Sequence, residues 1–150
     1  MPLTPQDPGF APRVRASFAS QPAMATIGAV LTRVEPGEVD IELPFRADLT
    51  QQNGFIHAGM LSAILDGACG YAAFTLMPAD ADVLSIEFKV NLLAPARGER
   101  IIARGRVVRA GRTISVCTAD AFAVRDGREH HVATMTGTMM TMLPRGTAAG

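Results

Sequence analysis

A single carboxylate lies in the most apolar stretch of the sequence. Asp66 is the one charged residue between Met60 and Leu76, and no cationic residue stands three or four positions away to pair with it along a helix. Burying an unpaired carboxylate is unfavourable, so such a group faces solvent, accepts local hydrogen bonds, or is retained for chemistry. The residue types are compatible with all three interpretations.

The residues just before this stretch predict a tight loop that leads into a helix N-terminus. They run from Asn53 to Gly59 and include a further glycine at position 54. The free N–H groups and the partial positive charge of a helix start attract an anion or a developing oxyanion. Gly59 would let another molecule approach that end closely. Two features of one helix therefore suggest chemistry: its start and its acid.

The apolar stretch itself is predicted to be the central helix of a small domain. It is apolar on all sides, which is typical of a buried helix, and it is too short to span a bilayer. Its end is expected near Met77 and Pro78, because proline disfavours helix in the residue before it. Such a helix must be covered, and a curved antiparallel sheet is the simplest cover.

The rest of the chain is expected to supply that sheet. Alternating apolar and polar residues, and turn signals such as Asp126-Gly127, predict strands at 24–34, 38–45, 83–93, 100–109, 112–125 and 129–142. The first two are expected to form a hairpin and the last four an antiparallel meander. Within 83–93, one face is expected to carry Leu84, Ile86, Phe88 and Val90. Open sheet edges favour pairing with a second copy, so we expect a dimer.

Three segments are expected along the chain. Residues 1–23 hold several prolines and would form an N-terminal arm with a short helical turn at 14–18. Residues 24–143 would form the folded α+β domain, and residues 144–150 a flexible tail.

Composition excludes several classes of function. The chain has 150 residues, of which 48% are hydrophobic and 19% charged, which predicts one globular domain with a substantial core. A formal net charge of zero and the absence of Trp argue against nucleic-acid binding. No signal peptide or membrane span is expected, so we expect a cytoplasmic protein without a membrane partner. Cys69 and Cys117 lie in apolar surroundings without metal-ligand spacing and are expected to be buried free thiols.

The loop and helix resemble those of a known family. The motif Gly54-Phe55-Ile56-His57-Ala58-Gly59, with an acid nine residues after the histidine, is similar to that of the hotdog-fold acyl-CoA thioesterases of the phenylacetate-degradation (PaaI-like) type. Residues 85–96 resemble the family's strand before a Pro-Ala turn, and residues 109–112 resemble its Gly-Arg hairpin. The resemblance runs from about residue 24 to residue 142. It implies a hotdog fold, with one long helix wrapped by an antiparallel sheet, and active sites where two subunits pair their sheets.

The resemblance also implies roles for the motif residues. Asp66 would act as general base for water, or as nucleophile, in cleavage of a thioester. The N–H groups of Ala58 and Gly59 would bind the oxyanion. His57 would shape the loop or contact the thioester, and Ser85 would help to position the water.

The sequence departs from the family pattern at two positions. The family's more common His-Gly-Gly is His57-Ala58-Gly59 here, which a helix start can accommodate. The family's Asn six residues before the histidine is Gln51 here. Either Gln51 or the nearby Asn53 would orient the thioester or the water.

The implied substrate is an aryl- or medium-chain acyl-CoA. Met60, with Leu61 and Phe74, would line the acyl tunnel. Arg109 and Arg112 would contact the phosphates of coenzyme A, for which guanidinium groups are well suited. A solvated edge that resists aggregation would explain the same arginines without any ligand.

No metal or redox cofactor is expected. His130 and His131 are adjacent on a predicted strand and would point to opposite faces. We expect an acyl-CoA substrate, no nucleic acid or membrane partner, and a homodimer or a dimer of dimers. Two other interpretations remain. One is a non-catalytic acyl-CoA binding or sensing module on the same fold, and the other is a hotdog dehydratase or hydratase, whose loop pattern residues 57–59 lack.

Overall fold

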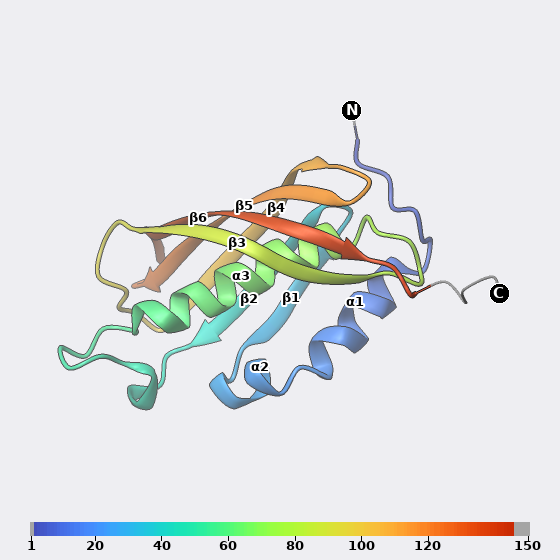
Figure 1. Cartoon of the computed structure of the whole chain (residues 1–150). Coiled ribbons are helices and arrows are strands. Elements are labelled where there is room, and N and C mark those ends of the chain that lie inside the picture. Colours follow the sequence, from blue (N-terminus) through green and yellow to red (C-terminus); the bar gives the residue numbers. More distant parts are fainter. Residues whose placement is uncertain (1, 146–150) are drawn as a thin grey trace.

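A computed structural model describes residues 2–145 of the chain. It contains one six-stranded antiparallel sheet that curves over one long helix, as Figure 1 shows. The strands are β1 (Val30–Glu35), β2 (Glu38–Pro44), β3 (Asp82–Leu92), β4 (Arg100–Ala110), β5 (Ile114–Arg125) and β6 (Arg128–Met142). The helices are α1 (Phe10–Ala19), α2 (Pro22–Ile27) and α3 (Ala58–Phe74), with a short 3₁₀ turn at Ala47–Leu49. The predicted α+β architecture is confirmed.

Helix α3 is the centre of the core. Its Ile64 and Leu65 are fully buried, as are Ile41 and Leu43 on β2. The sheet approaches the helix backbone closely at Gly105 of β4, where an added Cβ would lie 2.4 Å from the carbonyl carbon and oxygen of Ala68. Only glycine permits this contact. No helix within residues 2–145 is both long and apolar enough to cross a membrane.

The first predicted strand is wrong over its N-terminal half. Residues 24–34 were expected to form one strand, but α2 occupies Pro22–Ile27 and β1 begins at Val30. Proline at the first position of α2 favours the helix start, and Gly28 ends it in the left-handed conformation with φ of 77°. Both signals are local, so the sequence itself indicates where the helix ends and the strand begins within residues 22–34.

The predicted four-strand meander is also wrong. The sheet order is β1-β2-β4-β5-β6-β3, so only β4, β5 and β6 form a meander. Strand β2 occupies the side of β4 on which β3 was expected. The chain leaves α3 and enters the sheet beside β6, and β3 becomes an edge strand.

The expected common face of residues 84, 86, 88 and 90 is interrupted. The register of β3 against β6 shifts between Ser85 and Glu87, which marks a bulge that reverses the alternation. Val90 pairs with the buried Met135 and faces the helix, whereas Leu84 lies opposite Met140 on the outer face. The bulge therefore turns Ser85, rather than its apolar neighbours, toward α3.

The N-terminal segment is more structured than a single helical turn. Helix α1 has ten residues, and its Val14 is fully buried in the core. Arg13 donates hydrogen bonds to the carbonyl oxygens of Phe74, the last residue of α3, and of Met77 and Pro78 just after it, and its guanidinium lies 4.4 Å from the centre of the Phe74 ring. A cation there satisfies carbonyl groups that the helix leaves free.

Helix α3 ends at Phe74, three residues before the expected end, where the buried Thr75 hydroxyl donates to the Ala72 carbonyl and accepts from the Gly37 N–H. The domain boundary at residue 23 stays a prediction. Of the predicted tail, residues 146–150 lie outside the described residues.

Candidate functional site

The start of α3 is capped by its own histidine. His57 is the N-cap residue in extended conformation, with φ of −60° and ψ of 138°, and its Nδ1 accepts the N–H of Gly59 at 2.8 Å. A Cβ on Gly59 would lie 3.0 Å from that nitrogen, so glycine here admits the imidazole ring. The expected contribution of the Gly59 N–H to an oxyanion site would require the ring to release this bond. Histidine is not a common N-cap residue, and the sequence did not predict this cap.

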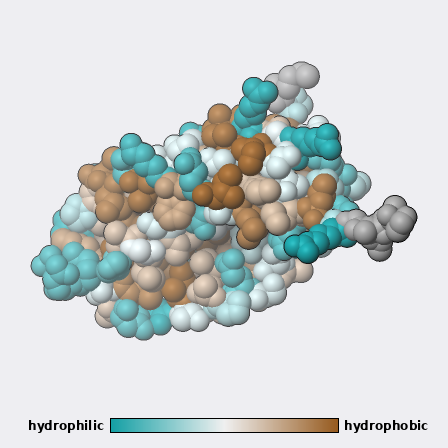
Figure 2. Space-filling view, in the orientation of Figure 1, coloured by the Kyte–Doolittle hydropathy of each residue, from teal (hydrophilic) through white to brown (hydrophobic). Residues whose placement is uncertain are grey.

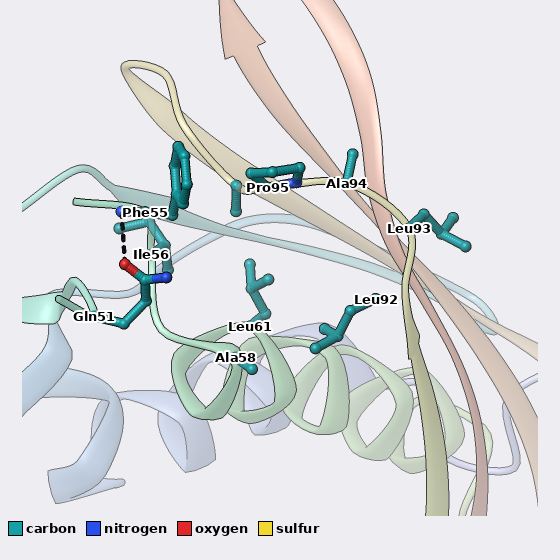
Figure 3. A pocket seen from close by; sticks show the side chains of 10 residues that line it. Gln51, Phe55, Ile56, Ala58, Leu61, Leu92, Leu93, Ala94 and Pro95 are labelled. Atoms are coloured by element: carbon teal, nitrogen blue, oxygen red, sulfur yellow. Dashed lines mark hydrogen bonds between the residues drawn. The ribbon is translucent and has the colours of Figure 1, made fainter. Parts of the chain in front are cut away.

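The N–H of Ala58 has no acceptor among the described residues, and Ala58 is one of the residues that line an apolar cavity. The cavity has a volume of about 480 Å³. Figure 3 shows that Ala58 and Leu61 of α3, Phe55 and Ile56 of the preceding loop, and residues 92–95 at the end of β3 all contribute to it. A free N–H beside apolar side chains can bind a carbonyl oxygen whose substituent is apolar.

Gln51 belongs to the same cavity, and Asn53 does not. The Oε1 atom of Gln51 accepts the backbone N–H groups of Asn53 and Phe55, at 2.6 and 3.3 Å. This arrangement holds the loop and leaves the Gln51 amide nitrogen free to donate into the cavity that Gln51 lines. Asn53 is exposed at the turn outside it.

Asp66 lies half-buried in a different, smaller cavity. Its Oδ1 accepts a hydrogen bond of 2.6 Å from the Ser85 hydroxyl, which the β3 bulge turns inward. The cavity measures about 140 Å³ and is largely polar, since Ser17, Gln21, Tyr71 and Asp82 also line it. Of the three interpretations of Asp66, local hydrogen bonding is therefore the one observed, and it leaves Oδ2 available for chemistry.

The N-terminal helices complete this polar cavity, which the sequence did not predict. The hydroxyl groups of Ser17 in α1 and Tyr71 in α3 are 3.2 Å apart. The Oε1 atom of Gln21, at the start of α2, is buried and has no hydrogen-bond partner among residues 2–145. The sequence predicts only an arm over residues 1–23, and its pattern does not place Gln21 beside Asp66.

Within one chain, the helix start and the acid are not brought together. Ala58 and Asp66 are eight positions apart on α3, which corresponds to about 12 Å along a helix axis. They also line separate cavities. A reacting carbonyl must lie about 3 Å from both the oxyanion donor and the base or nucleophile. One copy of the chain therefore does not assemble such a site.

The other predicted substrate-binding residues are dispersed. His57 and Met60 line a third cavity of about 470 Å³ with residues 26–27, 46 and 48–50. Arg112 lines a cavity beyond the far end of α3, together with Leu76 and Pro78. Arg109 is exposed at the end of β4.

The cysteines and the paired histidines lie outside these cavities. Cys69 and Cys117 are free and buried, as predicted. Burial raises the pKa of the Cys117 thiol to about 12 and the pKa of Cys69 further, so neither is poised as a nucleophile. His131 contacts Asp120 at 2.8 Å and His130 lies 3.5 Å from Arg125. Over the part of the chain that the structure describes, no three potential ligands gather to hold a metal ion.

Comparison with known proteins agrees with the fold and motif. The model of the Thioesterase superfamily matches residues 53–129. A structure of a thioesterase family protein from Silicibacter pomeroyi is 54% identical, covers 91% of this chain and 100% of that one, and superposes with a TM-score of 0.89. The PaaI protein of the Escherichia coli phenylacetic acid degradation operon is 16% identical, with 89% and 93% coverage and a TM-score of 0.79, and so shares the fold.

Two archaeal relatives carry names that assign them provisionally to the esterases. The one from Saccharolobus solfataricus is 30% identical over 95 residues, and the one from Halobacterium salinarum is 32% identical over 98 residues. The matches cover 63% and 62% of this chain. They span 66% and 64% of the relatives, slightly less than two thirds of their length.

Proposed function

The chain belongs to the thioesterase superfamily, and from this premise we propose that it hydrolyses an aryl- or medium-chain acyl-CoA to the free acid and coenzyme A. The observation that carries the proposal is that Ala58 lines the apolar cavity and that its N–H has no acceptor among residues 2–145. An acyl group would occupy the cavity while its thioester oxygen accepts that N–H. The Gln51 amide nitrogen would be a second donor beside it.

Asp66 would supply the base. With Oδ1 engaged by Ser85, Oδ2 would accept one proton of a water molecule. Gln21, which lines the same cavity, would help to hold that water, and the oxygen lone pair would attack the carbonyl carbon. A cavity of about 140 Å³ is large enough for such water.

The reaction would proceed through a tetrahedral intermediate. Water loses its proton to Asp66 as its oxygen bonds to the carbonyl carbon, and the negative charge moves to the oxygen at the Ala58 N–H. The intermediate collapses by breaking the carbon–sulfur bond, and the coenzyme A thiolate takes the proton from Asp66. Direct attack by Asp66 as nucleophile stays a prediction beside this route. Neither route uses a chemical group outside the protein, the substrate and water, so we propose no cofactor.

Two copies of the chain would form each site. The edge strand β3 has free backbone groups on one side and carries large exposed apolar residues, with Leu84 54% and Phe88 47% exposed. Figure 2 shows apolar side chains along the face where Figure 1 places β3. Pairing of this edge with a second copy would cover them. The dimer would bring Asp66 of one chain to the helix start of the other, and a dimer of dimers is compatible with this pairing.

A thiol-release assay across aliphatic and aryl acyl-CoA substrates tests the proposal. Asp66→Asn should lower kcat at least about 100-fold, which is typical of removing a general base. Asp80→Asn is the matched control, because Asp80 is exposed after α3 and lines none of the cavities described above. Full activity of Asp66→Asn would refute the mechanism. Acyl-CoA binding without hydrolysis by the wild type would instead favour a non-catalytic binding module.

A further inference from the structure

A basic cavity adjoins the apolar one. It has a volume of about 350 Å³ and shares Phe55, Ala94 and Pro95 with the cavity at the start of α3. Its remaining lining comes from the turn after β3 and from the β5–β6 hairpin, and consists of Arg97, Ala123, Arg125, His130 and Val132. A molecule could therefore occupy both cavities by passing along their common wall.

The cations of the basic cavity are not neutralised by the fold. The neighbouring Arg100 and Arg104 form ion pairs with carboxylates of β2 and β6. Arg97 and Arg125, in contrast, take part in none of the ion pairs found across residues 2–145. His130 lies 3.5 Å from the Arg125 guanidinium and adds a third nitrogen donor, since one ring nitrogen carries a proton in either tautomer.

These groups fit a phosphorylated nucleotide. Guanidinium groups without a carboxylate partner bind phosphate oxygens in charge-assisted hydrogen bonds, often two at a time. The Phe55 ring, which lines both cavities, offers a surface against which a base can stack. We propose that the basic cavity binds the phosphorylated nucleotide end of coenzyme A, with Arg97 and Arg125 as its phosphate ligands. The inference rests on the proposed function, because the thioester end would lie in the adjoining apolar cavity.

This assignment differs from the expectation drawn from the sequence, which stays a prediction. Arg109 and Arg112 were expected to contact the phosphates, but Arg112 lines the cavity beyond the opposite end of α3 and Arg109 lines neither cavity at its start. Both remain useful as matched controls, because they are exposed arginines whose removal changes the net charge equally.

Binding of adenosine 3′,5′-bisphosphate, measured by calorimetry, tests the inference without any need for catalysis. Arg97→Gln and Arg125→Gln should each weaken binding about 10-fold, the usual effect of losing a charge-assisted hydrogen bond. Arg109→Gln and Arg112→Gln should leave it within about twofold. Wild-type affinity should fall as salt is added, because the contacts are ionic. Equal effects of all four substitutions, or tight binding of inorganic phosphate alone, would overturn the assignment.

A comparison of two substrates shows which end of the substrate depends on Arg125. Arg125→Gln should raise KM for an acyl-CoA about 10-fold and leave KM for the matching acyl-pantetheine, which lacks the nucleotide, unchanged. A parallel rise for both substrates would mean that Arg125 acts on the thioester end or on folding, against the inference. Absence of hydrolysis by the wild type would overturn the proposed function, whereas the bisphosphate titration would still decide the nucleotide site.

Discussion

Replacing Ala58 by proline would remove one backbone N–H from the helix start and little else. Ala58 is the first residue of α3, a position where proline is favoured because its N–H is not needed by the helix. The preceding His57 already has ψ of 138°, which lies within the range that proline imposes on its predecessor. The Ala58→Pro protein should therefore fold, and Ala58→Val, of similar volume but with its N–H intact, is the matched control.

The expected loss of activity in Ala58→Pro follows from the proposed role of the Ala58 N–H as an oxyanion donor. Loss of one oxyanion donor lowers kcat by about 10²–10³, or roughly 3–4 kcal/mol of transition-state stabilisation. Asp66→Ala should have an effect of at least about 100-fold through loss of the base. Because the two residues are too far apart on one helix to serve one carbonyl, the two defects should lie in different chains of each site.

A heterodimer of the two variants tests this arrangement. One of its sites would combine Asp66 from the Ala58→Pro chain with the intact helix start of the Asp66→Ala chain, and the other would carry both defects. Co-expression with two different affinity tags and tandem purification would isolate it. Its activity should be about half that of the wild type, since one of two equivalent sites is intact. A heterodimer no more active than the two variant homodimers would refute the two-chain site.

Three further predictions concern stability and the thiols. Arg13→Met should lower the free energy of unfolding in urea by about 2 kcal/mol, because the Met77 carbonyl loses its donor and the Phe74 carbonyl keeps only the Met77 N–H. The exposed Arg15→Met should change that free energy by less than about 0.5 kcal/mol, and equal effects would contradict the capping role. Gly59→Ala should lower the free energy of unfolding by about 1 kcal/mol, because the added methyl group meets the capping imidazole at 3.0 Å. An unchanged midpoint of urea unfolding would count against the cap. Because burial raises the pKa of Cys69 and Cys117, both stay protonated at pH 8 and should react with a disulfide reagent only after unfolding, so labelling of the native protein would contradict their burial.

Local patterns were enough to identify the central elements. An unbroken apolar stretch around one acid predicted α3, and alternation with turn signals predicted the strands that follow it, to within a few residues. The glycines at positions 54 and 59 marked the loop and the helix start. These features depend on neighbours within one or two turns of chain, so the sequence displays them directly.

The sequence-based predictions failed where the structure depends on contacts between segments distant in the chain. Nothing in residues 83–93 indicates that they pair with β6 rather than with β4, because the same alternation suits either neighbour. The bulge that turns Ser85 to Asp66 also depends on that pairing. Likewise Gln21 lies in the Asp66 cavity because the preceding helix α1 packs against α3, where Ser17 meets Tyr71.

The sequence by itself therefore determined the helix, the identity of its acid and the motif at its start. Only the tertiary structure decided that Ala58 and Asp66 line separate cavities, and that Arg97 and Arg125 have no carboxylate partner among residues 2–145 beside one of them. The physical reason is that cavities and ion pairs form between segments distant in the chain. Their chemistry is set by which surfaces meet, and side-chain periodicity along one segment does not specify that.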